Sequence, residues 1–164
     1  MLKDSIEKII SGGQTGADKG GLIAAAKHSV VTGGVAPKDW KTETGKDITL
    51  KLYNLIESKS TKYRSRTLEN IKISDCTLLF ADKLSVGSNL TENLCLEIHK
   101  PFLKISNTYN LKEEDYLKMT TFLISVYKSK KKPIVINIAG NRESKSLGIE
   151  KRVEEILSVL MERY

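Results

Sequence analysis

The sequence is poor in the residues on which metal and disulfide sites depend. It has two cysteines and two histidines in 164 residues. Cys76 and Cys95 lie in the apolar segments CTLLF and LCLEI, which is typical of small buried side chains. His28 and His99 each end a helical pattern, outside any Cys/His/Asp cluster with metal-ligand spacing. We therefore predict no disulfide framework, no metal site and no catalytic role for either histidine.

Long apolar segments are also missing. The N-terminal MLKDSIEKII lacks the long apolar stretch of a signal peptide, and no later stretch approaches the length of a membrane span. There is no Gly-x-Ser-x-Gly motif, so a hydrolase with a nucleophilic serine has no support. These absences predict a cytoplasmic protein that does not contact a membrane.

Aromatic residues are scarce, at 6% of the chain, whereas basic residues are in excess. Lysine and arginine number 27 against 20 aspartates and glutamates, and the resulting formal charge of +7 favours anionic partners in general. The one basic run, Lys128 with 130–132, contains no aromatic residue, although proteins that bind RNA combine basic and aromatic side chains. We interpret the run as a solvated loop and do not expect a nucleic-acid partner.

Short apolar runs alternate with helical patterns along the chain. Runs of strand length lie at 6–10, 76–81, 101–105 and 134–138, with a shorter one at 30–32. Apolar side chains with helical spacing lie between them, at 17–27, 66–74, 90–100, 113–128 and 149–164. Segment 37–63 is polar and irregular, and we expect a surface excursion with a short helix at best.

This alternation predicts the fold class. Nearly continuous apolar strands suit a parallel sheet buried on both faces, and right-handed crossovers place helices on each side of it. We expect one domain over residues 1–164, with a Rossmann-like α/β fold of three α/β/α layers and a mostly parallel sheet. Because ligands of such sheets bind beyond the carboxyl ends of the strands, the residues just after each apolar run are the first candidates for a site.

The first strand leads into Ser-Gly-Gly-Gln-Thr-Gly-Ala-Asp, residues 11–18. Glycines there can adopt positive φ and let a ligand approach the backbone, while free amides and the dipole of the following helix attract an anion. The residues predicted to bind an anion are Gly12, Gly13, Gln14, Thr15 and Gly16. A tight turn in which Thr15 and Asp18 cap each other's amides is compatible with the same residues.

Two segments follow that combine small and basic residues. Gly34 and Lys38 belong to TGGVAPK after the short second strand, where they form either a pocket wall or a plain turn. Arg64, Arg66 and Thr67 belong to YRSRT, which we place just ahead of a helix. Guanidinium groups match oxyanions with two parallel hydrogen bonds, so these arginines are candidates for phosphate binding, with two solvated arginines as the alternative.

Two later strands end in the same way. SVGSNLTE supplies Gly87, Ser88, Asn89 and Thr91 at the start of a helix, where Asn89 and Glu92 could also form a cap. AGNRES supplies Gly140 and Arg142. Because the carboxyl ends of parallel strands meet at one edge of the sheet, we expect these segments to form one shared pocket for an anion.

The chain resembles the molybdenum carrier family, whose members belong to the Rossmann-like nucleotide-ligand-binding proteins related to the lonely-guy proteins. The resemblance rests, in this order, on IISGGQTGAD, TGG-x-x-PK, YRSRT-x-x-N-x-x-x-SD, the later glycine–threonine segment and N-x-AG-x-RES. The resemblance runs from residue 9 to about residue 148. It departs from the family pattern at residues 87–89, where the family tends to have Gly-Gly-Thr, at Asn141 in place of proline, and at Asp39-Trp40 in place of glycine and a basic residue.

The resemblance implies a permuted strand order, a homo-oligomer (tetramer or dimer) and a pocket for a phosphate-bearing small molecule. It places residues 12–16, Arg64, Arg66 and Thr67 on that ligand. Its known members include carriers of molybdenum cofactor, a pterin with a phosphate, so our first hypothesis is a binding protein with such a cargo, or a nucleotide-like ligand, and no turnover.

Two other hypotheses stay open. A nucleoside-monophosphate N-glycosidase, as among the lonely-guy relatives, would need a carboxylate near the sugar, and Glu92 is the best candidate, with Asp18 second. A nucleotide-sensing module that signals through its oligomer is the third.

Overall fold

A computed structural model describes residues 2–164. Its central sheet has five strands in the order β2-β1-β9-β7-β8, and every neighbouring pair is parallel. The strands are β1 (Ile6–Ser11), β2 (Val31–Gly33), β7 (Cys76–Phe80), β8 (Phe102–Ile105) and β9 (Ile134–Gly140). The predicted apolar runs are thus confirmed as strands of one parallel sheet. Its permuted order places the last strand, β9, between β1 and β7.

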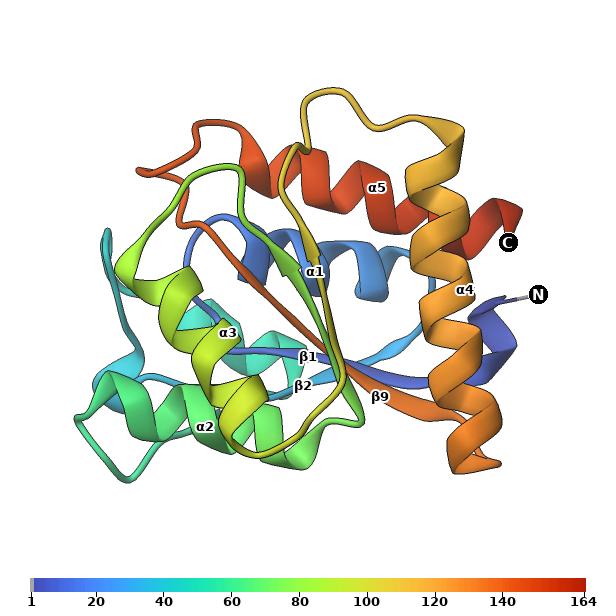
Figure 1. The fold of residues 1–164 in the computed structure, drawn as a ribbon. Helices are drawn as coiled ribbons and strands as arrows, with labels where there is room; N and C mark the ends of the chain where they lie inside the picture. Colours follow the sequence, from blue (N-terminus) through green and yellow to red (C-terminus); the bar gives the residue numbers. More distant parts are fainter. Residues whose placement is uncertain (1) are drawn as a thin grey trace.

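Helices cover both faces of the sheet, which confirms the predicted three-layer architecture (Figure 1). Side chains of α1 (Ala17–Lys27), α4 (Glu113–Lys130) and α5 (Ile149–Arg163) join the strands in the largest hydrophobic core. On the other face, α2 (Tyr63–Ile73) and α3 (Val86–Glu97) pack around Ile71, Leu94 and Cys95. The amphipathic pattern of α5 that the sequence shows buries Val153 and Leu157 in the main core.

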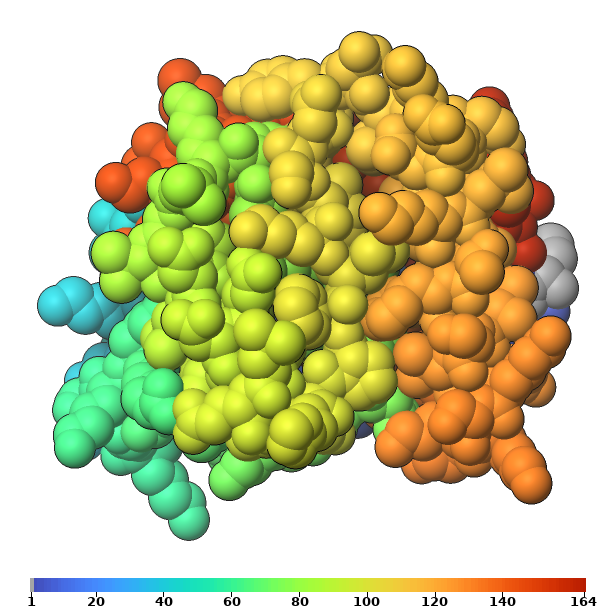
Figure 2. Space-filling model, in the orientation of Figure 1, coloured from blue at the N-terminus to red at the C-terminus, as the bar shows by residue number. Residues whose placement is uncertain are grey.

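On the side shown in Figure 2, side chains of α3, of segment 99–112, which includes the edge strand β8, and of α4 lie against one another. Among residues 2–164, no helix combines the length and the apolarity needed to cross a membrane.

Two helices begin earlier than the sequence predicts. α2 begins at Tyr63 and α3 at Val86, whereas apolar spacing placed their starts at residues 66 and 90. Both first turns are rich in polar or small residues, which do not contribute to an apolar pattern. At α3, Ser85 and Ser88 form a reciprocal capping box, so the predicted cap by Asn89 and Glu92 is wrong.

Segment 37–63 is more ordered than the expected surface excursion. It contains the hairpin of β4 (Lys41–Thr42) and β5 (Gly45–Lys46), the strand β6 (Ile56–Glu57) paired with β3 (Val35–Ala36), and the 3₁₀ helices Lys38–Trp40 and Ile48–Tyr53. Trp40, Leu50 and Leu55 bury their side chains against Leu22 of α1. These apolar residues follow neither helical nor strand spacing, which is why the sequence pattern did not reveal this second core.

Candidate functional site

Two pockets adjoin one another at the carboxyl edge of the sheet. The first, called the hairpin pocket, has a volume of about 540 Å³, and the second, called the α3 pocket, has about 550 Å³. The hairpin pocket is lined by Gln14, Pro37, Lys38, Asp39, Lys41, Thr42, Glu43, Ser60, Thr61, Lys62, Tyr63, Arg66 and Arg142. The α3 pocket is lined by Tyr63, Leu84, Ser85, Val86, Gly87, Asn89, Gly140, Arg142, Ser144 and Lys145. Tyr63 and Arg142 belong to both, so the two pockets meet at these side chains.

A small cavity of about 20 Å³ lies between the sheet and α2. This volume holds a water molecule but not a phosphate. Its lining is Gly12, Asp18, Tyr63, Arg66, Thr67, Asn70, Thr91, Asn137, Ala139 and Gly140. Arg66 therefore reaches from this cavity to the hairpin pocket.

One face of α2 supplies much of this lining. Tyr63, Arg66, Thr67 and Asn70 recur at the i, i+3, i+4, i+7 spacing that aligns side chains on a helix. Arg64 lies two residues before Arg66, and positions two apart point about 200° apart around a helix. Its guanidinium is accordingly exposed, and Nη2 pairs with Glu97 Oε2 at 2.9 Å.

Arg66 is the most unusual side chain of the site. It is 4% exposed, and its Nε and Nη2 atoms are buried without any hydrogen-bond partner in the protein. Its Nη1 lies 3.7 Å from Asp18 Oδ2, and its guanidinium carbon lies 4.7 Å from the centre of the Tyr63 ring. A methyl group on Gly12 would lie 1.5 Å from Nη1, so only glycine leaves room for this arginine. Buried donors without acceptors are costly, and an oxyanion would satisfy them.

Asp18 lies beside Arg66 in the same buried region. Its Oδ2 accepts a hydrogen bond from the Gln14 amide at 3.2 Å. Burial raises the pKa of Asp18 to about 6, although Arg66, the amides of Gln14 and Gly12, and Arg142 all favour the carboxylate. Near neutral pH the carboxylate is therefore charged, but it is far easier to protonate than an exposed aspartate.

The first loop does not present the free amides that we expected. The amide of Gly13 donates to Ser11 Oγ, that of Gln14 to Asp18, and that of Thr15 to Gln14 Oε1. α1 begins after Gly16, which has no side-chain cap, so mutual capping by Thr15 and Asp18 is also wrong. Here the chain's own Asp18 carboxylate takes the place that we assigned to an external anion.

The β4–β5 hairpin closes over this loop. Glu43 at its tip accepts hydrogen bonds from Thr15 Oγ1 and from the amide and hydroxyl of Ser144, and its own amide donates to Gln14 Oε1 at 3.0 Å. Burial alone would raise the pKa of Glu43, but the hydrogen bonds from Ser144 and Thr15 hold it below its ordinary value. The hairpin, the first loop and the β9–α5 loop are thus joined through one carboxylate.

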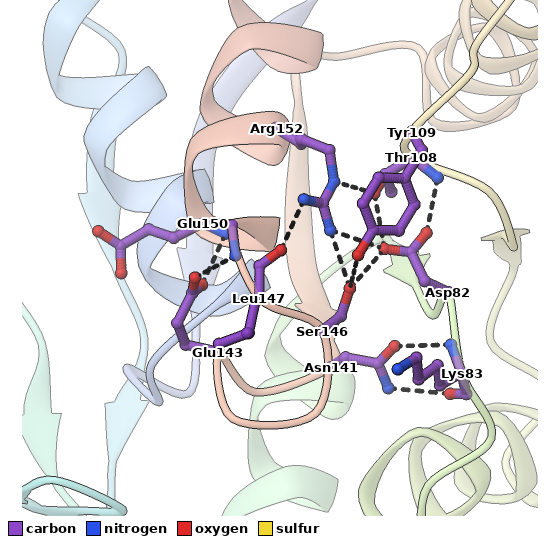
Figure 3. A network of polar contacts seen from close by, with 11 residues as sticks. Asp82, Lys83, Thr108, Tyr109, Asn141, Glu143, Ser146, Leu147, Glu150 and Arg152 are labelled. Atoms are coloured by element: carbon purple, nitrogen blue, oxygen red, sulfur yellow. Dashed lines mark hydrogen bonds and ion pairs between the residues drawn. The ribbon is translucent and has the colours of Figure 1, made fainter.

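A polar network fixes the loops after β7, β8 and β9 (Figure 3). Asp82 after β7 accepts hydrogen bonds from Thr108 and Ser146, and its Oδ2 lies 3.1 Å from Arg152 Nη2. The guanidinium of Arg152 stacks on Tyr109, 3.7 Å from the ring centre. Burial opposes the charge of Asp82, but the contacts with Thr108, Ser146 and Arg152 hold its pKa below the ordinary value. This network therefore holds the three loops in fixed positions relative to one another.

Two asparagine side chains each form a pair of hydrogen bonds with the main chain of a residue that is distant in sequence. Asn70 accepts from the Val35 amide at 2.8 Å and donates to the Val35 carbonyl at 3.0 Å. Asn141 does the same with Lys83, at 3.0 Å for each bond (Figure 3). These clamps tie α2 to β3 and the β9–α5 loop to the end of β7, and so position Arg66 and Arg142.

The structure brings together most of the predicted site residues. Those that line the two pockets or the small cavity are Gly12, Gln14, Lys38, Arg66, Thr67, Gly87, Asn89, Thr91, Gly140 and Arg142.

Other predicted residues have structural partners and line none of these spaces. Side chains at Gly13, Gly16 and Gly34 would clash with Leu55, with the Asn141 carbonyl and with the Ser11 carbonyl, respectively. The Thr15 hydroxyl donates a hydrogen bond to Glu43, and Ser88 is part of the capping box at the start of α3. Arg64 and Glu92 form ion pairs outside the pockets, the latter with Lys104 at 2.8 Å.

Several lining residues were not among those predicted. Tyr63 and Asn70 belong to a polar stripe of α2, and their spacing from Arg66 could have revealed them once α2 was known to begin at Tyr63. Glu43 and Lys41 reach the site through a hairpin for which the sequence has no clear signal. Among residues 2–164, no group of three or more His, Cys, Asp or Glu could hold a metal ion.

Comparison with known proteins places the chain in a family. Residues 9–161 match the model of the circularly permutated YpsA SLOG family. A solved structure described as a "Putative molybdenum carrier protein" from Syntrophus aciditrophicus SB aligns with 96% of this chain and 96% of its own, at 34% sequence identity and a TM-score of 0.86. A search of curated proteins finds no match. Since the family model covers nearly all of the sequence, the chain belongs to the circularly permutated YpsA SLOG family.

Proposed function

We propose that the protein binds and carries a phosphate-bearing small molecule, with the phosphate in the hairpin pocket next to Arg66. The observation that carries the proposal is the buried guanidinium of Arg66, whose Nε and Nη2 lack hydrogen-bond partners, at a pocket that is rich in cations. Lys38, Lys41, Lys62 and Arg142 line the same pocket, against the acids Asp39 and Glu43, and Glu43 is already engaged by Thr15 and Ser144. An excess of positive charge around a desolvated arginine favours a phosphate or a similar oxyanion.

The second pocket indicates what else the ligand carries. The α3 pocket adjoins the hairpin pocket through Tyr63 and Arg142, and it is lined partly by the apolar side chains of Leu84 and Val86. A molecule with a phosphate in one pocket and a ring system in the other fits this arrangement. Nucleotides have this form, and so does molybdenum cofactor, and the name of the solved relative describes a molybdenum carrier. Either would be cargo, held without chemical change.

Isothermal titration calorimetry with AMP, GMP and molybdenum cofactor tests the proposal. Replacing Arg66 by Gln should weaken binding about 10- to 100-fold, since a charge-assisted hydrogen bond contributes on the order of 1.5–3 kcal/mol. Arg64→Gln is the matched control, because it removes the same charge two residues away on the exposed side of α2. Equal binding by wild type and Arg66→Gln would remove Arg66 from the site.

One observation favours a second candidate, hydrolysis of a nucleoside monophosphate. The carboxylate that this reaction needs is not Glu92, which pairs with Lys104 away from the pockets, but Asp18 lines the small cavity and has a raised pKa. Release of free base from AMP or GMP is the measurement. Release that disappears in Asp18→Asn would support the enzyme, and binding without release would leave the carrier.

A further inference from the structure

We infer that Asp18 is an internal competitor for the anion site, and that an incoming anion gains full access to Arg66 only when Asp18 takes up a proton. The inference rests on the proposed function, since it concerns how the same site is regulated. It makes ligand binding a proton-coupled step, with tight binding at low pH and release at higher pH.

The contacts of Arg66 and Asp18 motivate the inference. Their side chains are 5% and 9% exposed, and the shortest contact between them is 3.7 Å. That distance is longer than a hydrogen bond, so Asp18 compensates the charge of Arg66 without satisfying its donors. Nε and Nη2 of Arg66 stay unpartnered. The arginine thus has two donors available for a second acceptor while one carboxylate already lies beside it.

An anion on those donors would share the Arg66 guanidinium with the Asp18 carboxylate, which lies beside Nη1. Two negative charges around one guanidinium repel each other, and the repulsion is strong where water is excluded. A proton on Asp18 removes the repulsion and leaves Arg66 to the ligand. The amides of Gly12 and Gln14 also face the Asp18 side chain.

Among residues 2–164, no other group near Asp18 changes its charge near neutral pH, so none can take the role of the proton. Arg66 on α2 and Arg142 after β9 are the charged groups that act on Asp18, and Tyr63 lines the same cavity. Both arginines stay positive over the whole physiological range. The pKa of Asp18 in the free protein is already raised to about 6 by burial, so proton uptake needs little further cost near neutral pH.

Sulfate is the probe for the test, because unlike phosphate it does not change its own charge between pH 5.5 and 8.5. Its affinity for the full chain is measured by calorimetry across this range. Above pH 7 we expect affinity to fall about tenfold per pH unit, the slope for one coupled proton. Titrations at pH 7.5 in two buffers of different ionisation enthalpy should show uptake of one proton per sulfate bound. In Asp18→Asn, sulfate binding should be tighter at pH 8 and independent of pH.

Asp39→Asn is the matched control, since it removes one negative charge from the same pocket but leaves the Arg66–Asp18 pair intact. It should keep the slope of the wild type. Near-ultraviolet circular dichroism confirms that each variant is folded. A flat pH dependence in wild type, or the same slope in Asp18→Asn, overturns the inference while leaving the proposed ligand binding in place. Absence of sulfate binding at every pH also overturns it, and the proposed function is then decided separately by the nucleotide titrations.

Discussion

Arg152 of α5 and Asp82 after β7 form an ion pair whose atoms Nη2 and Oδ2 are 3.1 Å apart, and Thr108 and Ser146 complete it from two other loops. The Asp82 side chain is 4% exposed. Three loops and helix α5 therefore share one buried carboxylate. None of the polar groups in this network lines the two pockets, so its effect on the site is to hold the loops that do.

Replacing Arg152 by Met should lower the free energy of unfolding by about 3 kcal/mol, because it leaves the buried Asp82 charge without its cation. Urea denaturation measures this as a lower midpoint with an unchanged slope. Arg64→Gln breaks an exposed ion pair and should cost less than about 1 kcal/mol. Equal losses in the two variants would show that burial of the Asp82 pair has no special effect.

Replacing Gly12 by Ala should weaken anion binding as much as Arg66→Gln does. The new methyl group would lie 1.5 Å from Arg66 Nη1 and must displace the guanidinium. Gly33→Ala is the control, since a methyl group there meets nothing closer than 3.5 Å. Calorimetry with AMP compares the three proteins. Unchanged affinity in Gly12→Ala would mean that the position of Arg66 does not matter for the ligand.

Replacing Asp18 by Asn should change how stability depends on pH. A folded pKa of about 6, against an ordinary 3.8, means that the folded protein binds the proton more tightly than the unfolded chain. Stability of the wild type relative to the variant is then greatest below pH 4 and falls as pH rises to about 6, by on the order of 3 kcal/mol. Urea midpoints of both proteins between pH 4 and 8 measure the difference. A constant difference would show that Asp18 titrates normally.

Replacing Glu43 by Ala should loosen the hairpin without unfolding the sheet. The variant loses the contacts to Thr15 and Ser144, so amide hydrogen exchange should become faster in segments 41–46 and 142–146. Lys46→Ala changes the same hairpin without removing the Glu43 contacts and should exchange like the wild type. Protection that stays unchanged in Glu43→Ala would mean that other contacts hold the hairpin.

Much of the fold could be predicted from the sequence because buried parallel strands are short, apolar and bounded by glycine and polar residues. The five strands and five long helices follow from this pattern. Segment 37–63 could not be predicted in the same way. Its buried residues Trp40, Leu50 and Leu55 have no regular spacing, and their partner Leu22 is on α1, so only tertiary contacts show that they form a core.

The location of the site could be predicted from the sequence, but the contacts of its individual residues could not. Glycines at strand ends indicate a close backbone approach, yet the approaching group at Gly16 is the Asn141 carbonyl and not a ligand. The two arginines of YRSRT looked equivalent, and only the start of α2 at Tyr63 separates the buried Arg66 from the exposed Arg64. The assembly and the ligand stay predictions.

The paired hydrogen bonds of Asn70 and Asn141 have a consequence for the ageing of the protein. Each side chain must both donate and accept, and each is almost fully buried, at 2% and 1% exposure. Deamidation would turn the donor into a carboxylate oxygen that faces a backbone carbonyl oxygen, and attraction would become repulsion. The change adds one mass unit and is chemically slight, but at these two positions it would release the segments that carry Arg66 and Arg142. Spontaneous loss of ammonia at either asparagine would therefore disrupt the proposed ligand site without any mutation.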